Sequence, residues 1–261
     1  MKTSDSAEYT AKKRFFDQML TVYGRKPVLE ALQDPATEVY RLHLASSNKK
    51  APILDDIVQL AQDKGAEVVY HERKALSRIS KNSKQDQGVA VDLICRGYQA
   101  SQDFLQAPPR ENYELLALDG ITNPQNLGMI IRSACAGTID GILLPKQGSA
   151  KIDPLVIKAS AGTLFKSRLL RCEDLAETLA DFQRRGCQIY GLSSHAKFQL
   201  GQKLPAGPKI FVLGNESDGV SKPVGQICDQ LLAIPMNNGV ESLNVAVTAS
   251  LLAFRNMLMN S

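Results

Sequence analysis

The chain has 261 residues, of which 44% are hydrophobic and 22% are charged, and its formal net charge is +4. The length exceeds one typical domain of about 100–200 residues, and this balance of apolar and charged side chains excludes an intrinsically disordered protein. The small positive charge permits an acidic partner such as nucleic acid. No stretch approaches about 18 consecutive apolar residues, and the polar N-terminus lacks the apolar segment of a signal peptide. We therefore expect a cytoplasmic protein that does not bind membranes.

The first hundred residues have the pattern of a small α/β domain, which we place at 19–96. Residues 1–18 are predicted to be a polar extension, in which 12–16 could form a short basic helix, although a frayed terminus fits better. A turn and a helix follow from Val22 (V-Y-G-R-K-P-V-L-E-A-L). Apolar periodicity then predicts a strand at 41–45, a helix at 53–64, and strands at 67–70 and 88–95.

A concentration of basic residues lies between positions 71 and 84, where Glu72 is the single acid among Arg73, Lys74, Arg78, Lys81 and Lys84. Such a concentration suits contact with phosphates. A solvated helix or loop face explains it equally well. The run is therefore a candidate nucleic-acid contact and no more.

Residues 97–112 show no sustained period and contain Pro108-Pro109, which predicts a linker. Beyond it, strand-like runs alternate with helical ones, at 114–119, 127–136, 141–145, 159–164, 175–185, 187–192, 209–214, 230–236 and 243–259. This alternation predicts a second domain at 113–261, an α/β fold with a mostly parallel sheet and helices on both faces. Ligands bind such sheets at the carboxyl ends of the strands, so the loops there are the candidate site.

The first of these loops follows the strand at 114–119 and reads G-I-T-N-P-Q-N-L-G-M-I-I-R. Asn123-Pro124 predicts a turn, and Asn126 is predicted to be the N-cap of the next helix. Arg132 would then lie near the N-terminal end of that helix, where a guanidinium beside free backbone N–H groups makes an anion site. Capped helices after strands are common, so this loop alone is a weak signal.

Two further polar loops follow strands. After 209–213 comes G-N-E-S-D-G, in which Glu216 would be an exposed carboxylate at a strand end, as it also would be in an ordinary surface turn. After 230–236 comes N-N-G-V-E-S-L-N, in which Ser242 is predicted to cap a long apolar helix from Leu243 onward. Ordinary capping explains Ser242 but leaves the amide of Asn244 unexplained.

Several common sites are absent from the sequence. It contains no G-x-G and no Gly-Lys pair, so it lacks the dinucleotide fingerprint and the Walker loop. The five cysteines, at positions 95, 135, 172, 187 and 228, include no C-x-x-C pair. Their odd number and spacing favour neither a disulfide framework nor a zinc site, so we expect reduced thiols and no bound metal.

Taken together, the three loops resemble the ordered motifs of the SpoU family of RNA ribose methyltransferases, within the SPOUT superfamily. The matching segments are N-P-Q-N-L-G-M-I-I-R (123–132), L-G-N-E-S-D-G-V (213–220) and I-P-M-N-N-G-V-E-S-L-N-V-A-V (234–247). Upstream, V-Y-G-R-K-P-V-L-E-A-L (22–32) is similar to the start of the family's L30e-like substrate-binding domain. One departure follows Ala136, where the family often has an aromatic residue and a glycine and this chain has G-T-I-D-G.

The resemblance implies a trefoil knot in the C-terminal domain, S-adenosylmethionine bound in the knot, and a homodimer formed through the knotted region. Main-chain groups around five residues would hold the cofactor in a pocket of apolar strand ends: Leu213, Gly214, Ile234, Met236 and Leu243. The positions that match the family's catalytic and RNA-facing residues are Asn126, Arg132, Glu216, Ser242 and Asn244. The apolar helix at 243–259 could serve the dimer interface or simply the core.

The reaction implied by the resemblance is methyl transfer from S-adenosylmethionine to a ribose 2'-hydroxyl, which is helped mainly by positioning. A guanidinium with a pKa above ~12 is a poor proton acceptor. We therefore expect Arg132 to hold the adjacent phosphate and stabilise the developing alkoxide, while that phosphate or a water takes the proton. Asn126 and Asn244 are expected to orient Arg132 and the ribose, and Glu216 to fix a loop or an arginine.

Ribosomal RNA is the expected substrate, with a guanosine of 23S rRNA as one candidate, because the substrate-binding domain resembles the ribosomal RNA branch of the family. A tRNA 2'-O-methyltransferase is the alternative within the same class. A non-catalytic RNA-binding or ribosome-assembly protein on the same scaffold is a second class, against which the intact motif residues argue. A nicotinamide-dependent oxidoreductase fits the strand-helix alternation only, and fold pattern alone does not establish function.

Overall fold

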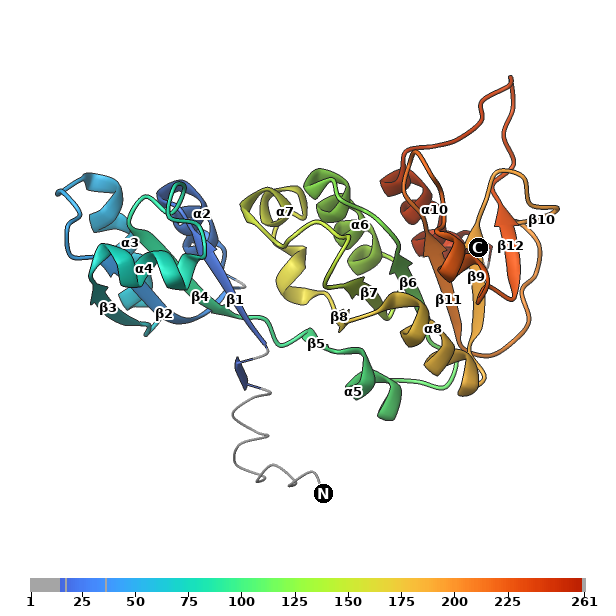
Figure 1. The fold of residues 1–261 in the computed structure, drawn as a ribbon, viewed down its shortest axis with the longest axis horizontal. Coiled ribbons are helices and arrows are strands. Elements are labelled where there is room, and N and C mark those ends of the chain that lie inside the picture. The colour runs from blue at the N-terminus through green and yellow to red at the C-terminus, as the bar shows by residue number, and fades with distance from the viewer. Residues whose placement is uncertain (1–14, 17, 36, 260–261) are drawn as a thin grey trace. The chain divides into compact units, whose positions relative to one another are not determined.

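The computed structural model describes residues 15–16, 18–35 and 37–259, which fold into two compact units (Figure 1). The first unit comprises the residues up to Arg96 together with Ile152–Ile157, and the second comprises Gly97–Lys151 and Lys158–Ser261. The basic helix considered at 12–16 lies almost entirely outside the described residues, as does most of the predicted extension at 1–18. None of the described helices combines the length and hydropathy that a membrane span requires.

The first unit is built around a four-stranded sheet in the order β1-β4-β2-β3. Strand β4 is antiparallel to both of its neighbours, whereas β2 and β3 are parallel. The predicted helices and strands are confirmed, but strand β1 was not foreseen, and the segment of α4 had been left open as a helix or a loop. In chain order the elements are β1 (Met19–Tyr23), α2 (Arg25–Gln33), β2 (Glu38–Ala45), α3 (Pro52–Asp63), β3 (Glu67–His71), α4 (Arg73–Ser80) and β4 (Val89–Ile94).

A chain of polar side chains crosses this sheet from strand to strand. Nδ1 of the buried His43 lies 2.9 Å from Nε2 of His71, and its Nε2 lies 3.0 Å from Oδ2 of Asp92. The hydroxyl of Thr21 donates to the other oxygen of Asp92 at 2.6 Å. Four strands therefore contribute to one hydrogen-bonded network.

The second unit contains an eight-stranded sheet in the order β10-β12-β9-β11-β6-β7-β8-β5, and every adjacent pair in it is parallel. The elements after Arg96 are β5 (Tyr98–Ala100), α5 (Ser101–Gln106), β6 (Glu114–Leu118), α6 (Pro124–Ala136), β7 (Gly141–Pro145), α7 (Pro154–Ala159), the 3-10 helix η1 (Thr163–Lys166), β8 (Leu169–Cys172), α8 (Leu175–Arg184), β9 (Gln188–Leu192), β10 (Phe198–Gln199), β11 (Lys209–Leu213), α9 (Lys222–Gly225), β12 (Gln230–Ala233) and α10 (Val245–Met259).

Helices cover both faces of this sheet, as predicted from the sequence. Successive residues of a strand face opposite sides, so Leu115 and Ala117 of β6 pack in one core with α5, α8 and α9. On the other face, α10 lies over β11, where the guanidinium carbon of Arg255 is 5.5 Å from the ring centre of Phe211. Helix α6 packs beside α10. Both faces of the central strands are therefore buried, which explains why their sequences are continuous apolar runs.

The linker predicted at 97–112 is wrong for its first half. Strand β5 pairs with β8 at the edge of the large sheet, and Phe104 of α5 is 1% exposed. Gly97 is required here because an added Cβ would lie 2.1 Å from the carbonyl oxygen of Ser167. A three-residue strand and a six-residue helix are too short to show a period in the sequence.

Candidate active site

The three polar loops meet at the carboxyl ends of strands that are close neighbours in the sheet. Strand β6 precedes the first loop, β11 the second and β12 the third, and the sheet order β12-β9-β11-β6 brings them together. Because all these strands are parallel, their loops emerge at the same edge. The topology thus explains why segments far apart in sequence share one site.

The first loop leads into α6, whose N-cap is Asn123. The side-chain oxygen of Asn123 accepts from the backbone nitrogens of Gln125 at 2.9 Å and Asn126 at 3.3 Å. The prediction that Asn126 is the N-cap is therefore wrong, because the helix begins at Pro124, where proline favours the first helical position. Asn126 instead lies in the first turn and is buried.

The second loop is a tight turn that holds Glu216 at its tip. An added Cβ at Gly214 would lie 2.1 Å from the carbonyl carbon of Gly219, so the two backbones are in close contact. Asn215 and Gly219 exchange backbone hydrogen bonds of 3.0 and 2.8 Å, and the Asn215 amide donates to the carbonyl of Gly120 at 3.1 Å. The loop is fixed both within itself and to the end of β6.

The third loop leads into α10, and Asn244 caps this helix. Its Oδ1 accepts from the backbone nitrogen of Ala246 at 2.8 Å, and the helix begins at Val245. The predicted cap at Ser242 is therefore wrong. The turn before it uses Asn238 and Gly239 at φ +56° and +71°, a region that favours these two residue types.

The three loops are joined by a triad of hydrogen-bonded side chains, Asn126, Glu216 and Asn244. Nδ2 of Asn126 donates to Oε1 of Glu216 at 2.8 Å, and Nδ2 of Asn244 donates to the same oxygen at 3.1 Å. Nδ2 of Asn244 also lies 3.1 Å from Oδ1 of Asn126. Both amides direct donors at one carboxylate oxygen, which fixes the orientation of the two amides and of Glu216.

Arg132 does not join this triad. It lies eight residues after Pro124, so it is beyond the first helical turn, and its predicted place beside free backbone N–H groups is wrong. Its side chain is exposed and forms no hydrogen bond with another described residue. Arg132 lies farther from the start of α6 than predicted because the N-cap is Asn123 and not Asn126.

A cavity of about 940 Å³ opens beside the triad. Glu216, Ser242 and Asn244 line it, whereas Asn126 and Arg132 do not. All five residues that the sequence analysis assigned to a cofactor lie in its wall, namely Leu213, Gly214, Ile234, Met236 and Leu243. The resemblance therefore selected residues that the fold brings together around one space.

The part of the cavity wall that follows β9 was not predicted from the sequence. Leu192, Ser193 and His195 line the cavity from this segment, and Thr248 does so from α10. The sequence contains a signal for this segment, because the polar residues S-S-H (193–195) directly follow the strand predicted at 187–192. Among the described residues, no group of three or more His, Cys, Asp or Glu side chains is placed to hold a metal ion.

Comparison with known families gives two matches that together span most of the chain. The SpoU rRNA Methylase family matches residues 114–254. The family described as RNA 2'-O ribose methyltransferase substrate binding matches residues 21–94. The candidate site lies wholly within the first of these matches.

Several proteins are similar over nearly the whole chain. A tRNA/rRNA methyltransferase of Mycolicibacterium vanbaalenii is 35% identical, over 89% of this chain and 74% of its own length. One of Mycolicibacterium smegmatis is 32% identical, over 95% and 79%. Among solved structures, an RNA methyltransferase of the TrmH family from Porphyromonas gingivalis has a TM-score of 0.58 at 28% identity, over 95% and 91%. The SpoU methyltransferase AviRb of Streptomyces viridochromogenes, in complex with AdoMet, shares the fold with a TM-score of 0.64 at 21% identity, over 98% of each chain.

Proposed function

The chain belongs to the SpoU rRNA methylase family, and on this premise we propose that it transfers a methyl group from S-adenosylmethionine to a ribose 2'-hydroxyl of ribosomal RNA. The observation that carries the proposal is the Asn126–Glu216–Asn244 triad at the edge of the cavity. A binding scaffold without catalysis has no need for two amides and a carboxylate fixed at the mouth of a cofactor-sized space.

The cavity of the second unit suits this cofactor. Its volume of about 940 Å³ falls within the range of about 300–1,000 Å³ that ligand pockets have. Apolar strand ends such as Leu213 and Ile234 line one part, and Ser193 and Glu216 add polar groups. Gly214 lies in the cavity wall without a side chain, so its main chain would be available for hydrogen bonds to an adenine edge. When bound, S-adenosylmethionine supplies a methyl group on a cationic sulfur.

Positioning is the main contribution of the triad to the reaction. The amides of Asn126 and Asn244 are directed at Glu216 rather than at Arg132, which revises the role that the sequence analysis gave them. Glu216 ties the loop after β11 to the starts of α6 and α10. The three loops then hold the substrate ribose in one orientation, and correct orientation lowers the barrier to transfer.

Arg132 acts in this proposal as the clamp for the phosphate next to the target ribose. Its exposed guanidinium has no partner among the described residues, and its planar fork matches two phosphate oxygens. It stabilises the negative charge that develops on the 2'-oxygen, while the bound phosphate or a water accepts the proton.

A homodimer is part of the proposal, formed through α6 and α10. These helices pack together and leave apolar side chains exposed, including Met129, Val247 and Met257 at 46%, 43% and 51%. Exposed apolar groups on two adjacent helices are typical of an interface. Sedimentation analysis of the full chain tests this part, and a monomer at micromolar concentration would contradict it.

Mapping of 2'-O-methyl marks tests the substrate. Ribosomal RNA and tRNA are compared from cells with and without the protein, and one ribose of ribosomal RNA is expected to lose its mark. A mark lost only from tRNA would favour the tRNA alternative. Unchanged marks together with retained RNA binding would favour a non-catalytic protein.

A further inference from the structure

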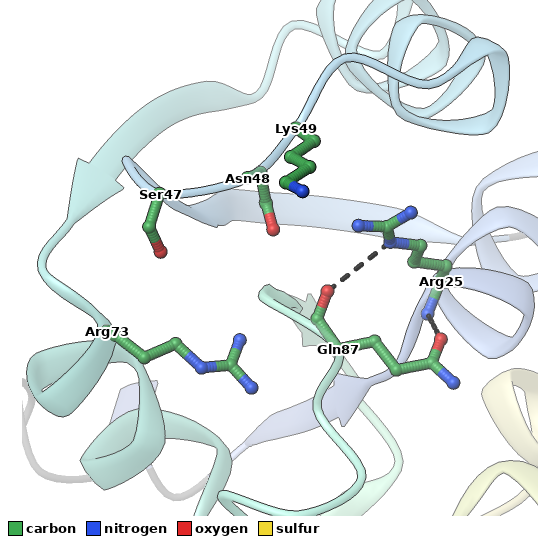
Figure 2. A pocket seen from close by; sticks show the side chains of 6 residues that line it. All are labelled: Arg25, Ser47, Asn48, Lys49, Arg73 and Gln87. Atoms are coloured by element: carbon green, nitrogen blue, oxygen red, sulfur yellow. Dashed lines mark hydrogen bonds between the residues drawn. The ribbon is translucent and has the colours of Figure 1, made fainter.

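The first unit contains a cavity of about 690 Å³ with a strongly basic wall (Figure 2). Its lining side chains come from the start of α2, the turn after β2, the start of α4 and the turn before β4: Arg25, Ser47, Asn48, Lys49, Arg73 and Gln87. The wall includes three cations and no carboxylate. The guanidinium groups of Arg25 and Arg73 extend from opposite sides toward Gln87 (Figure 2).

Arg73 is held in place by a buried carboxylate. Its Nη2 lies 2.8 Å from Oδ1 of Asp86, whose side chain is fully buried. Asp86 in turn accepts from the hydroxyl of Ser80 at 3.0 Å and from the backbone nitrogen of Gly88 at 2.9 Å. One nitrogen of the guanidinium thus fixes the side chain, and the remaining donors are left for a ligand.

Arg25 is held by the turn before β4. Its backbone nitrogen donates to Oε1 of Gln87 at 3.1 Å, and its Nε donates to the carbonyl of Gln87 at 3.4 Å. Gln87 itself has a φ of +49°, a left-handed conformation that costs free energy outside glycine. The next residue, Gly88, is anchored by the Asn48 amide, which donates to its carbonyl at 2.8 Å.

Two arginines are therefore oriented toward the same space before any ligand arrives, and a lysine adds a third positive charge. A planar guanidinium fork matches a phosphate group, and fixing the fork in advance lowers the entropy lost on binding. We propose that this cavity binds a single phosphate of the RNA backbone and so anchors the substrate. This inference rests on the proposed function, because it takes the ligand to be the RNA that is methylated.

The proposed anchor differs from the basic run at 71–84. Of the five cations in that run, Arg73 alone lines the cavity, and Arg25 and Lys49 come from segments for which the sequence predicted no phosphate contact. Phosphate contacts fix register and orientation but carry no base information. The cavity therefore sets affinity and placement, and the choice of nucleotide is made elsewhere.

The chain supplies a matched control for the test. Exposed lysines outside the cavity wall directly follow two of its cations: Lys26 follows Arg25, and Lys50 follows Lys49. The cavity variant Arg25→Gln/Lys49→Gln and the control variant Lys26→Gln/Lys50→Gln each remove two positive charges, at adjacent positions in the sequence. A general electrostatic effect would weaken RNA binding equally in both.

Binding of the full chain to an unmodified 23S rRNA transcript is measured at several salt concentrations. We expect the cavity variant to raise Kd about tenfold and to lower the slope of log Kd against log salt by about 1 to 2, while the control variant changes Kd less than about twofold. Inorganic phosphate should compete with the transcript for the wild type more effectively than for the cavity variant. Equal effects of the two variants would overturn the proposal.

Arg73 needs a separate design, because its loss leaves the carboxylate of Asp86 buried without a cation. The double variant Arg73→Gln/Asp86→Asn removes both charges, and thermal denaturation verifies that it folds. It is expected to raise Kd as the cavity variant does, and to raise KM for RNA more than it lowers kcat. A folded double variant with wild-type Kd would contradict the anchor.

The two proposals fail in different ways. If the wild type methylates the transcript and the cavity and control variants bind it equally, the anchor is wrong and the methyltransferase stands. If the cavity variant alone loses binding and the wild type transfers no methyl group to any ribosomal RNA, the anchor stands as an RNA site and the proposed function is wrong.

Discussion

Asn126 and Asn244 lie 118 positions apart in the chain, yet Nδ2 of Asn244 is 3.1 Å from Oδ1 of Asn126. Each amide also donates to the same oxygen of Glu216. This contact joins the first turn of α6 to the N-cap of α10. The starts of the two helices therefore hold each other in place. Disturbing either amide should therefore affect the ends of both helices and the cavity between the loops.

Replacing the Asn126 donor with an acceptor tests how much the triad contributes to activity and stability. Asn126→Asp keeps the side-chain shape but replaces the Nδ2 donor with an oxygen that faces Glu216, so two carboxylates would repel each other. We expect methyl transfer to fall more than about tenfold and the free energy of unfolding to fall by about 1–3 kcal/mol. Gln125→Glu adds the same charge one residue earlier on an exposed side chain and should behave as the wild type. Equal losses in the two variants would contradict the account of the triad.

Asn244 has two roles that can be separated. Asn244→Ala removes the cap of α10 and the contact with Glu216, whereas Asn244→Ser can still cap the helix. We expect Asn244→Ala to lower the free energy of unfolding by about 1 kcal/mol and Asn244→Ser to lower it by a few tenths. Both should lose most methyl transfer, as measured by initial rates. A fully active Asn244→Ser would mean that the helix cap is the whole function of this residue.

Arg132 should affect the RNA step without affecting cofactor binding, because it lies outside the cavity wall. Arg132→Lys keeps the charge but loses the planar fork, and we expect kcat/KM for RNA to fall at least about tenfold. The Kd for S-adenosylmethionine, measured by calorimetry, should stay within about twofold of the wild type. Near-normal turnover in Arg132→Lys would exclude a bidentate phosphate clamp.

The opposite end of the sheet carries a buried ion pair that should matter for stability. Nη2 of Arg255 on α10 lies 2.8 Å from Oε1 of Glu114 on β6, with the side chains 7% and 6% exposed. Glu114→Ala leaves a buried cation, so we expect a loss of about 3–5 kcal/mol in urea unfolding. The double variant Glu114→Leu/Arg255→Met should lose less, because the Arg255 cation is removed together with its partner. A larger loss in the double variant would show that packing, rather than charge, dominates here.

Acid should destabilise the first unit through the histidine network. Burial lowers the pKa of His71, and the positive charges of His43 and Arg41 lower it further. Burial alone would raise the pKa of Asp92, but hydrogen bonds from His43 and Thr21 and nearby positive charge outweigh it, and the net pKa is lowered. Unfolded His71 takes up a proton as the pH falls through 6.5, whereas folded His71 stays neutral to lower pH. His71 therefore destabilises the folded state as the pH falls below 6.5. The stabilising contribution of Asp92 is lost at lower pH, as the pH falls through the lowered pKa that Asp92 has in the folded state.

Unfolding in urea at pH 7.5 and 5.5, followed by a probe in the first unit, measures this effect. The wild type should lose stability between these values, and His71→Gln should lose less, because it removes one of the groups that gains a proton on unfolding. Identical pH dependence in the two proteins would contradict the assignment to His71.

The fold was predictable where the strands are central and buried on both faces. Runs such as 115–118 and 210–213 are continuous apolar segments, and they form most of β6 and β11. Strands β8 and β10 have four and two residues, and pairing in the folded sheet, rather than sequence pattern, makes them strands. The trefoil knot that the resemblance implies stays a prediction.

The sequence was sufficient to predict which residues gather at the candidate site, but not which of them contact one another. Parallel topology places Asn126, Glu216 and Asn244 at one edge, but the direction of each amide depends on loop conformations set by residues such as Gly214 and Gly219. Asn123 and Asn126 are both able to cap a helix, and Pro124 between them was the signal that favours Asn123. In the first unit, Arg25, Lys49 and Arg73 lie far apart in the sequence, so only the folded chain shows that they share a cavity.

The position of the transferred methyl group distinguishes ribose methylation from base methylation. The purified chain is incubated with methyl-labelled S-adenosylmethionine and unmodified ribosomal RNA, and the product is hydrolysed in alkali, which cleaves RNA through its free 2'-hydroxyl groups. Transfer to a ribose predicts labelled dinucleotides that resist alkali, with the label lost in Asn126→Asp. Label recovered in mononucleotides would place the methyl group on a base, and no label despite bound cofactor would contradict the proposed activity.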